Sequence, residues 1–352
     1  MRGVNLGGWF SQIDAIAEKD PGGFPGKRSH MRSFLGPADF ARIKSWGFDH
    51  VRLPLDWQNA FDESIRPDEE VLRLLDSAVD GILASGLELI LDLHKCPGHD
   101  FLDGTIRDQA FFADAGHRRD CLRVWDQLAE RYGDRPGIML ELLNEPVAPS
   151  AEIWNEVKDE LAAAVRRMAP KATLVIGSNL WNSAAQFEKL ESFDDDNTLY
   201  SVHVYNPIIF THQRAPWCVG AAFKEHRTYP GNYTVTDDGA SRLPLDEAGR
   251  WDRDRLTQSL APVFRFRDRH SARIACTEFG VYMGGPDRES RHAWMRDVLG
   301  LFKEHDIGWS YWNYKNLDFG IISVGERLFD AATQYDNPDR IDRELLDMLM
   351  KG

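Results

Sequence analysis

Eight short apolar runs, each bounded by glycine, proline or polar residues, alternate along the 352-residue chain with amphipathic helical patterns. The predicted strands are Arg2–Leu6, His50–Leu55, Leu87–Leu93, Ile138–Leu143, Thr173–Gly177, Leu199–Val204, Arg273–Thr277 and Gly308–Trp312. Several are nearly continuous in apolar residues, which is typical of parallel strands covered by helices. Eight strand–helix units favour one α/β domain, a closed (β/α)8 TIM barrel, over an open doubly wound sheet. Because no GxGxxG follows a strand, a dinucleotide-binding fold is the weaker alternative.

The intervening helical patterns are strongest in two segments. Asp68–Ala84 opens with three acidic residues, which suit a helix N-terminus, and places its apolar residues on one face. Ala151–Ala169 repeats the pattern and ends before Pro170. Further helices are predicted near Pro37–Trp46, His117–Tyr132, Asp252–His270, Arg288–His305 and Asp339–Met350, with a short one at Asn182–Glu188.

One connection is unusually long. The segment of about 207–251, after the sixth strand, has no strong period and is rich in aromatic residues. Long connections in compact domains are usually functional or form a small subdomain. We therefore predict a subdomain inserted after strand 6 and lying over the barrel mouth, with a packing elaboration as the alternative.

Charge and composition narrow the class of partner. The formal net charge of −14 argues against binding to nucleic acid or to an anionic membrane, and it suits a neutral substrate. No run of about 18 apolar residues predicts a membrane span. Because the first predicted strand begins at Arg2, no signal peptide is expected, which predicts a cytoplasmic protein unless a leader has been removed, in which case it is secreted. The four cysteines show no CxxC pattern, so we expect free thiols and no zinc site, and the sequence sets no oligomeric state.

Candidate functional residues gather at the strand ends. In a barrel of this kind the reacting groups come from the C-terminal ends of the strands. Those ends carry Arg52, His94, Asn144, Glu145, His203, Tyr205, Glu278 and Trp312. Each alone has a structural explanation, such as an ion-pair partner, a core histidine or a packed tryptophan. Their convergence on one rim of one barrel favours a common site.

Two of these residues are carboxylates on strands 4 and 7, across the barrel mouth from one another. Splitting an acetal needs one acid to protonate the departing oxygen and one carboxylate to trap the oxocarbenium-like carbon. We assign Glu145 as the acid, with a raised pKa, and Glu278 as the nucleophile, held ionised by Arg52 and Tyr205. A separation of about 5–5.5 Å between the carboxyls predicts retention of configuration.

The other rim residues suit sugar contacts. Asn144 is expected to hydrogen-bond the sugar 2-hydroxyl, and Trp312 to form an aromatic floor. Glu141 is a rival carboxylate four residues before Glu145, about 13 Å lower by strand rise, and is predicted to be a buried structural acid toward the barrel bottom. Candidates for extra sugar subsites are Trp9, Trp181 and Trp217.

The ordered set of motifs resembles glycoside hydrolase family 5. Asn144-Glu145-Pro146 resembles the acid/base motif and Thr277-Glu278-Phe279-Gly280 the nucleophile motif, and the remaining strand-end residues match family positions one by one. Asn5-Leu6-Gly7-Gly8-Trp9 and Trp312-Asn313-Tyr314-Lys315 are similar to a subgroup of leaderless bacterial endoglucanases of the endoglucanase C type. The resemblance implies hydrolysis of β-1,4 or mixed-linkage glucans and cello-oligosaccharides without a cofactor or metal. Lys95 stands where many relatives have a second histidine, which puts nearby sugar contacts in doubt.

Alternatives remain at this stage. The opening segment also resembles exo-β-1,3-glucanases, mannan and xylan stay open as substrates, and endo and exo action are not distinguished. A glycan-binding barrel that has lost catalysis is disfavoured because both carboxylates are present. A metal-dependent hydrolase would use His94, His99 and His203, but no HxH or HExxH motif supports it.

Overall fold

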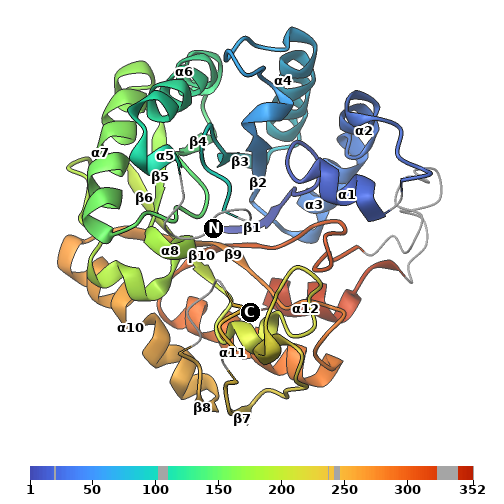
Figure 1. Cartoon of the computed structure of the whole chain (residues 1–352). Coiled ribbons are helices and arrows are strands. Elements are labelled where there is room, and N and C mark those ends of the chain that lie inside the picture. The colour runs from blue at the N-terminus through green and yellow to red at the C-terminus, as the bar shows by residue number, and fades with distance from the viewer. Residues whose placement is uncertain (20, 102–109, 237, 242–245, 323–339, 352) are drawn as a thin grey trace.

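Eight parallel strands close into a barrel ringed by helices (Figure 1). The computed structural model describes residues 1–352 except 20, 102–109, 237, 242–245, 323–339 and 352. In chain order the barrel strands are β1 (Arg2–Asn5), β2 (His50–Asp56), β3 (Glu88–Lys95), β4 (Ile138–Glu141), β5 (Thr173–Gly177), β6 (Thr198–Val204), β9 (Arg273–Phe279) and β10 (Gly308–Tyr311). Each pairs with the next, and β10 pairs with β1 to close the barrel. The predicted (β/α)8 fold is confirmed.

Helices cover the outside of the barrel between successive strands (Figure 1). They are α1 (Ile13–Lys19), α2 (Lys27–Ser33), α3 (Pro37–Trp46), α4 (Glu69–Ala84), α5 (Ala110–Ala113), α6 (Ala115–Tyr132), α7 (Ala151–Met168), α10 (Arg253–His270), α11 (Arg288–Glu304) and α12 (Arg343–Lys351), with the short turn η1 (Trp57–Asn59) after β2. Between β5 and β6 the chain forms only α8 (Asn179–Asn182) and the 3-10 turn η2 (Ala184–Glu188). The long helix α10 packs against η2 and so covers this part of the barrel.

The acidic start of α4 has the expected capping role. The Asp68 side chain accepts hydrogen bonds from the backbone N–H groups of Glu70 and Val71 at 3.0 and 3.2 Å. These are two of the N–H groups that a helix start leaves without an intrahelical partner. The apolar face of α4 then buries Val71 and Leu75 against the barrel. The local sequence therefore fixes both where the helix begins and which side packs inward.

The barrel interior changes from apolar to polar along the strands. Ile90, Val175, Leu199 and Ala275 form a buried apolar cluster inside the barrel. Because side chains alternate along a strand, the next inward positions on β3 are Asp92 and then His94. Both are buried, so the polar groups of the mouth stand directly on an apolar layer.

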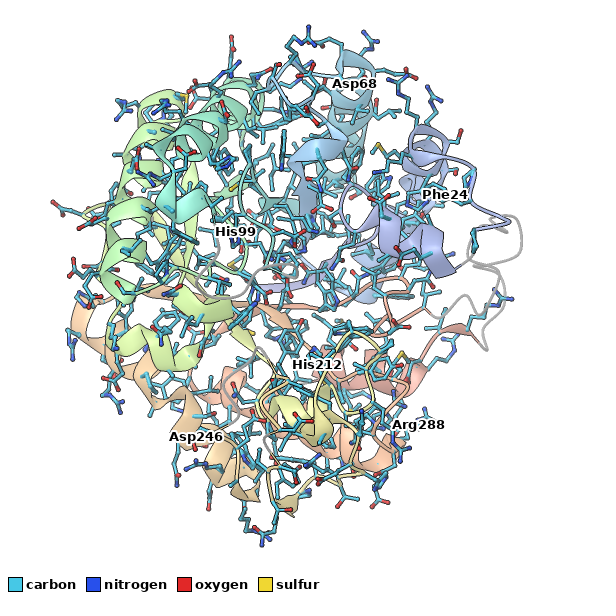
Figure 2. All side chains as sticks on the ribbon, in the orientation of Figure 1. Phe24, Asp68, His99, His212, Asp246 and Arg288 are labelled. Atoms are coloured by element: carbon cyan, nitrogen blue, oxygen red, sulfur yellow. The ribbon has the colours of Figure 1, made fainter. Side chains whose placement is uncertain are left out.

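The segment predicted as an insertion leaves the barrel after β6 and returns at α10. It contains α9 (Ile208–Thr211), η3 (Ala221–Phe223) and a two-stranded antiparallel sheet of β7 (Gly231–Tyr233) and β8 (Gly249–Trp251). Figure 2 places His212 and Asp246 of this segment over the lower half of the molecule. Cys96, Cys121, Cys218 and Cys276 form no disulfide, and no helix among the described residues is long and apolar enough to span a bilayer.

Candidate active site

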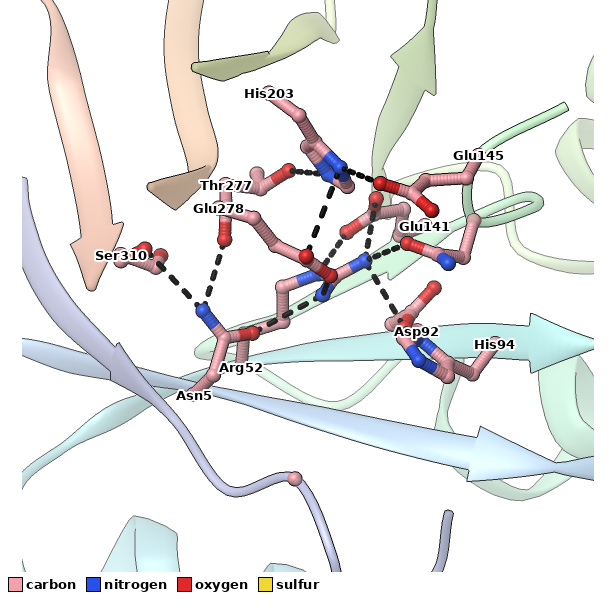
Figure 3. Close-up of polar contacts among 12 residues, drawn as sticks. Asn5, Arg52, Asp92, His94, Glu141, Glu145, His203, Thr277, Glu278 and Ser310 are labelled. Carbon is pink, nitrogen blue, oxygen red and sulfur yellow. Dashed lines mark hydrogen bonds and ion pairs between the residues drawn. The ribbon is translucent and has the colours of Figure 1, made fainter. Parts of the chain in front are cut away.

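Arg52 is the hub of the polar network inside the barrel mouth (Figure 3). Its side chain is fully buried and faces three carboxylates. Nε and Nη2 donate to the two oxygens of Glu141 at 2.6 and 3.0 Å, Nη2 lies 3.0 Å from Asp92, and Nη1 donates to Glu278 at 2.7 Å. Burial raises the pKa of both Asp92 and Glu141 to about 7, although the guanidinium opposes this rise. The Arg52 guanidinium thus contacts all three of these carboxylates and holds them close together in the barrel mouth.

Two asparagines fix the orientation of this guanidinium. Asn5 Oδ1 accepts from Arg52 Nη1 at 3.0 Å, while Asn5 Nδ2 donates to the Thr277 carbonyl at 2.9 Å. Asn144 Oδ1 accepts from Nη2 at 2.8 Å, which leaves Asn144 Nδ2 without a partner among the described residues. A buried donor with no partner is costly unless a ligand accepts from it. Asn144 can therefore donate to a bound substrate.

Both oxygens of Glu278 accept hydrogen bonds. Oε1 receives Arg52 Nη1, and Oε2 receives the Tyr205 hydroxyl at 3.0 Å. Burial raises the pKa of Glu278 above its usual value, and the Arg52 guanidinium opposes this rise. Burial and the nearby Glu278 charge raise the pKa of Tyr205 well above its usual value, so this phenol stays protonated and donates. These contacts favour an ionised, fixed carboxylate at Glu278.

Glu145 faces Glu278 from the other side. One carboxyl oxygen of each, together with a His203 ring nitrogen, lie within 4.8 Å of one another. Burial, and then the Glu278 charge, raise the pKa of Glu145 well above its usual value, so the proton of the pair resides on Glu145. His203 Nδ1 is 2.8 Å from Glu145 Oε1, and its Nε2 is 3.1 Å from Thr277 Oγ1. A carboxylic acid and a carboxylate thus meet across a gap that suits direct attack on an acetal carbon.

The backbone at Glu145 is itself unusual. Its φ of 44° lies in the left-handed region, which residues other than glycine rarely adopt. Such strain persists where surrounding structure enforces it, and it is frequent at functional sites.

His94 and Trp312 form another wall of the barrel mouth. Their rings stack with centroids 5.9 Å apart and planes 5° from parallel. His94 Nδ1 is 2.7 Å from Asp92 Oδ2, and His94 Nε2 has no partner among the described residues. The Trp312 ring also lies against Gly7, where an added Cβ would be 2.7 Å from it. That close approach requires glycine in the Asn5–Trp9 motif.

Comparison with known proteins agrees with this geometry. The profile of the family "Cellulase (glycosyl hydrolase family 5)" matches residues 16–318. Endoglucanase C of Acetivibrio thermocellus is 34% identical over 331 residues, covering 91% of this chain and 93% of the relative. Cellodextrinase A of Ruminococcus flavefaciens is 35% identical over 310 residues, covering 87% and 83%. The chain belongs to glycosyl hydrolase family 5. The crystal structure of endoglucanase Cel5A from Thermotoga maritima superposes with a TM-score of 0.74 at 25% identity, covering 99% of this chain and 96% of that one.

In this family 5 enzyme a cavity of about 940 Å³ opens beside Glu145. It runs from the barrel mouth to the inserted segment and α10, and His212 and Asp246, which are labelled in Figure 2, are among its lining residues. Trp181 and Trp217, two of the three predicted subsite tryptophans, line this cavity. Trp217 is 44% exposed, and Trp181 is half-buried with its Nε1 donating to the Phe101 carbonyl at 3.1 Å.

The third tryptophan does not reach the cavity. Trp9 is 3% exposed, and its Nε1 donates to the Met31 carbonyl of α2 at 2.7 Å. Its ring packs against Phe10 and Phe40, with centroids 4.9 and 5.9 Å apart. The predicted subsite at Trp9 is therefore wrong, because α2 covers this ring and makes it part of the core.

Glu141 is buried, as predicted, but it is closer to the chemistry than its distance along the strand suggested. It shares Arg52 with Glu278 because the long arginine side chain joins the two levels of the barrel. Sequence reasoning missed Asn5 and Asp92 as partners of Arg52. The sequence did indicate a role for Asp92, because it lies two residues before His94 and so on the same face of β3.

The histidines of the metal alternative are not brought together. His94 Nδ1 contacts Asp92, His99 Nε2 lies 3.3 Å from the Asn144 carbonyl, and His203 contacts Glu145 and Thr277. Over the part of the chain that the structure describes, the cluster with ligand atoms this close is Glu145, His203 and Glu278. That cluster contains the two acids of the acetal-splitting pair.

Proposed function

We propose that this enzyme hydrolyses β-1,4-linked or mixed-linkage glucans and cello-oligosaccharides by double displacement, with Glu278 as nucleophile and Glu145 as acid and base. The observation that carries the proposal is the approach of the two carboxyl groups to within 4.8 Å, one favoured as the acid and one as the ion. Relatives named endoglucanase C and cellodextrinase A support a glucan or cellodextrin as the substrate.

In the first step, a Glu278 oxygen attacks the anomeric carbon while Glu145 gives its proton to the departing glycosidic oxygen. The Glu278 carboxylate becomes a neutral ester. Because the negative charge that raised the pKa of Glu145 is then gone, Glu145 holds its negative charge more easily. In the second step Glu145 takes a proton from water, the water oxygen bonds to the anomeric carbon, and Glu278 leaves as a carboxylate.

Other wall groups support the sugar during both steps. Asn144 Nδ2 donates to the 2-hydroxyl, a contact that strengthens in the transition state. Trp312 offers its ring face to the sugar in the cleaved subsite. The cavity on the Glu145 side receives the departing part of the chain, with Trp181 and Trp217 as aromatic surfaces.

The test pairs two variants with two leaving groups. We expect Glu278→Gln to lose nearly all turnover on every substrate. Glu145→Ala should still release 2,4-dinitrophenolate from the aryl β-cellobioside in a burst, because this leaving group needs no proton, and should lose turnover on cellotetraose. Equal losses on both substrates in Glu145→Ala would count against the assignment.

A product profile decides the linkage. We expect release of reducing sugar from cello-oligosaccharides and lichenan to exceed release from laminarin, mannan and xylan. A preference for laminarin would move the proposal to the β-1,3-glucanases, and a preference for mannan to the mannanases. Glucan binding without release of reducing sugar from any of these would favour a non-catalytic barrel.

A further inference from the structure

Glu247 is a buried carboxylate near the C-terminal end of the inserted segment. Its side chain is 3% exposed and lies between the insertion and the loop that follows β6. Oε1 accepts from Ile208 N at 2.6 Å and from Asn206 Nδ2 at 3.2 Å, and Oε2 accepts from Ile209 N at 3.0 Å. Three donors from one short stretch thus converge on one carboxyl group. We refer to this group of contacts as the Glu247 clamp.

The clamped stretch begins at the residue after Tyr205, which hydrogen-bonds the proposed nucleophile. Trp294 Nε1 donates to the Asn206 carbonyl at 2.9 Å, and Thr211 Oγ1 donates to the Tyr205 carbonyl at 2.6 Å. The backbone at 205–209 is therefore held by Trp294 of α11, by Thr211 of α9 and by Glu247 near the far end of the insertion. Of these supports, the clamp is the one that the insertion supplies through a carboxylate.

Burying a carboxylate costs free energy, which its hydrogen bonds and ion pairs have to offset. Leaving water raises the pKa of Glu247 to about 7, while the hydrogen bonds from Ile209, Ile208 and Asn206 lower it, as does the charge of Arg227. Charge-assisted hydrogen bonds are stronger and more directional than neutral ones. A carboxylate kept in this position at such a cost suits a requirement for fixed geometry nearby.

We propose that Glu247 is a positioning residue, through which the inserted segment holds the loop after β6 so that the Tyr205 hydroxyl stays on Glu278. The proposal rests on the proposed function, since it needs Glu278 as the nucleophile. It predicts that the insertion shapes the leaving-group cavity and also sets the orientation of the nucleophile on the other side of the cleaved bond.

The test is a double-mutant cycle on β-cellobiosyl fluoride, whose leaving group is a single atom and fills no subsite. In Glu247→Gln an amide replaces one acceptor oxygen, and we expect kcat/KM to fall about tenfold through kcat. In the Tyr205→Phe background the same change should cost less than about twofold, because the hydroxyl that it positions is already gone. Glu247→Asp, which keeps the charge on a shorter arm, should lie between Glu247→Gln and the unchanged enzyme.

The matched control is Asp238→Asn. Asp238 is another carboxylate of the insertion that accepts backbone N–H groups, from Ala221 at 2.9 Å and Ala240 at 3.2 Å, but it contacts nothing in the clamp. For Asp238→Asn we expect kcat/KM within about twofold of the unchanged enzyme and a smaller loss in thermal midpoint than in Glu247→Gln, because Asp238 is exposed and Glu247 is buried. If Glu247→Gln does not fold, Asn206→Ala carries the same cycle, because it removes one donor of the clamp and leaves the carboxylate in place.

The outcomes distinguish a positioning role of Glu247 from direct binding of the leaving group, and both from a failure of the proposed function. Equal fold losses for Glu247→Gln with and without the Tyr205 hydroxyl would overturn the proposal. So would a loss on cello-oligosaccharides but none on the fluoride, since that result would mean that Glu247 binds the leaving group directly. Full activity in Glu247→Gln together with an inactive Glu278→Gln removes only this inference, whereas an active Glu278→Gln removes the proposed function itself.

Discussion

Replacing Tyr205 by phenylalanine removes one hydroxyl that donates to Glu278 Oε2 at 3.0 Å and leaves the ring in place. A hydrogen bond to a charged group contributes about 1.5–3 kcal/mol. Since about 1.4 kcal/mol corresponds to one pKa unit, the pKa of Glu278 should rise by about 1–2 units in Tyr205→Phe. The nucleophile must be ionised, so the acidic limb of kcat/KM against pH should move upward by that amount.

The assay is the pH dependence of kcat/KM on an aryl β-cellobioside between about pH 4 and pH 8. At the pH of the plateau we also expect a fall of about tenfold, because the carboxylate loses one of the two contacts that orient it. Tyr200→Phe is the matched control, since Tyr200 lies on β6, the strand that leads to Tyr205, and its hydroxyl accepts from Phe193 N at 2.7 Å, outside the site. An acidic limb that does not move in Tyr205→Phe, with a plateau within twofold of the unchanged enzyme, would refute the reasoning.

Three further predictions concern the pH dependence of stability, the cavity and metals. Burial raises the pKa of Glu141 from an ordinary 4.5 to about 7, so its contribution to stability is complete below about pH 4.5 and is lost as the pH rises through about 7. Glu141 alone should therefore lower the free energy of unfolding, measured with urea, by up to about 3 kcal/mol between pH 5 and pH 8, and Asp92 and Glu247 should add to this fall. Glu141→Gln should make the slope shallower, and an unchanged slope in the variant would contradict the assignment. Trp181→Ala should lower kcat/KM about tenfold on cellopentaose but less than about twofold on β-cellobiosyl fluoride, because the fluoride leaving group does not fill the cavity. Equal losses on the two substrates would place Trp181 outside the leaving-group subsite. Activity should survive exhaustive dialysis against EDTA, and a large loss that one divalent ion restores would favour the metal alternative.

The sequence predicted the barrel well because its strands are short apolar runs with sharp polar ends. Helix α3 was expected and found at Pro37–Trp46, where proline starts the helix and Gly47 ends it. Strand β9 runs two residues beyond its predicted end at Thr277, so that Glu278 lies within the ladder. Helices α1 and α2 were missed because each is only seven residues long, which is too short to show a clear period.

The rule that function lies at strand ends found the two acids and the side chains that face them. It could not find the supports beneath them, because those depend on which strands are neighbours and on how far a side chain reaches. Asn5 is bonded to Arg52 because β1 and β2 pair in that register, and Glu247 reaches the loop after β6 from a segment with no periodic pattern. Trp9 was misjudged for a related reason, since the helix that covers it was not predicted.

The proposal that Glu278 is the nucleophile is tested most directly by trapping its covalent intermediate. A 2,4-dinitrophenyl 2-deoxy-2-fluoro-β-cellobioside slows the second step more than the first, so the glycosyl ester should accumulate. Intact-mass analysis should then show one added glycosyl group per chain, and peptide mapping should place it on Glu278, with activity returning as the ester is hydrolysed. A label on Glu141 or another carboxylate, or no label with products of inverted configuration, would contradict the double displacement.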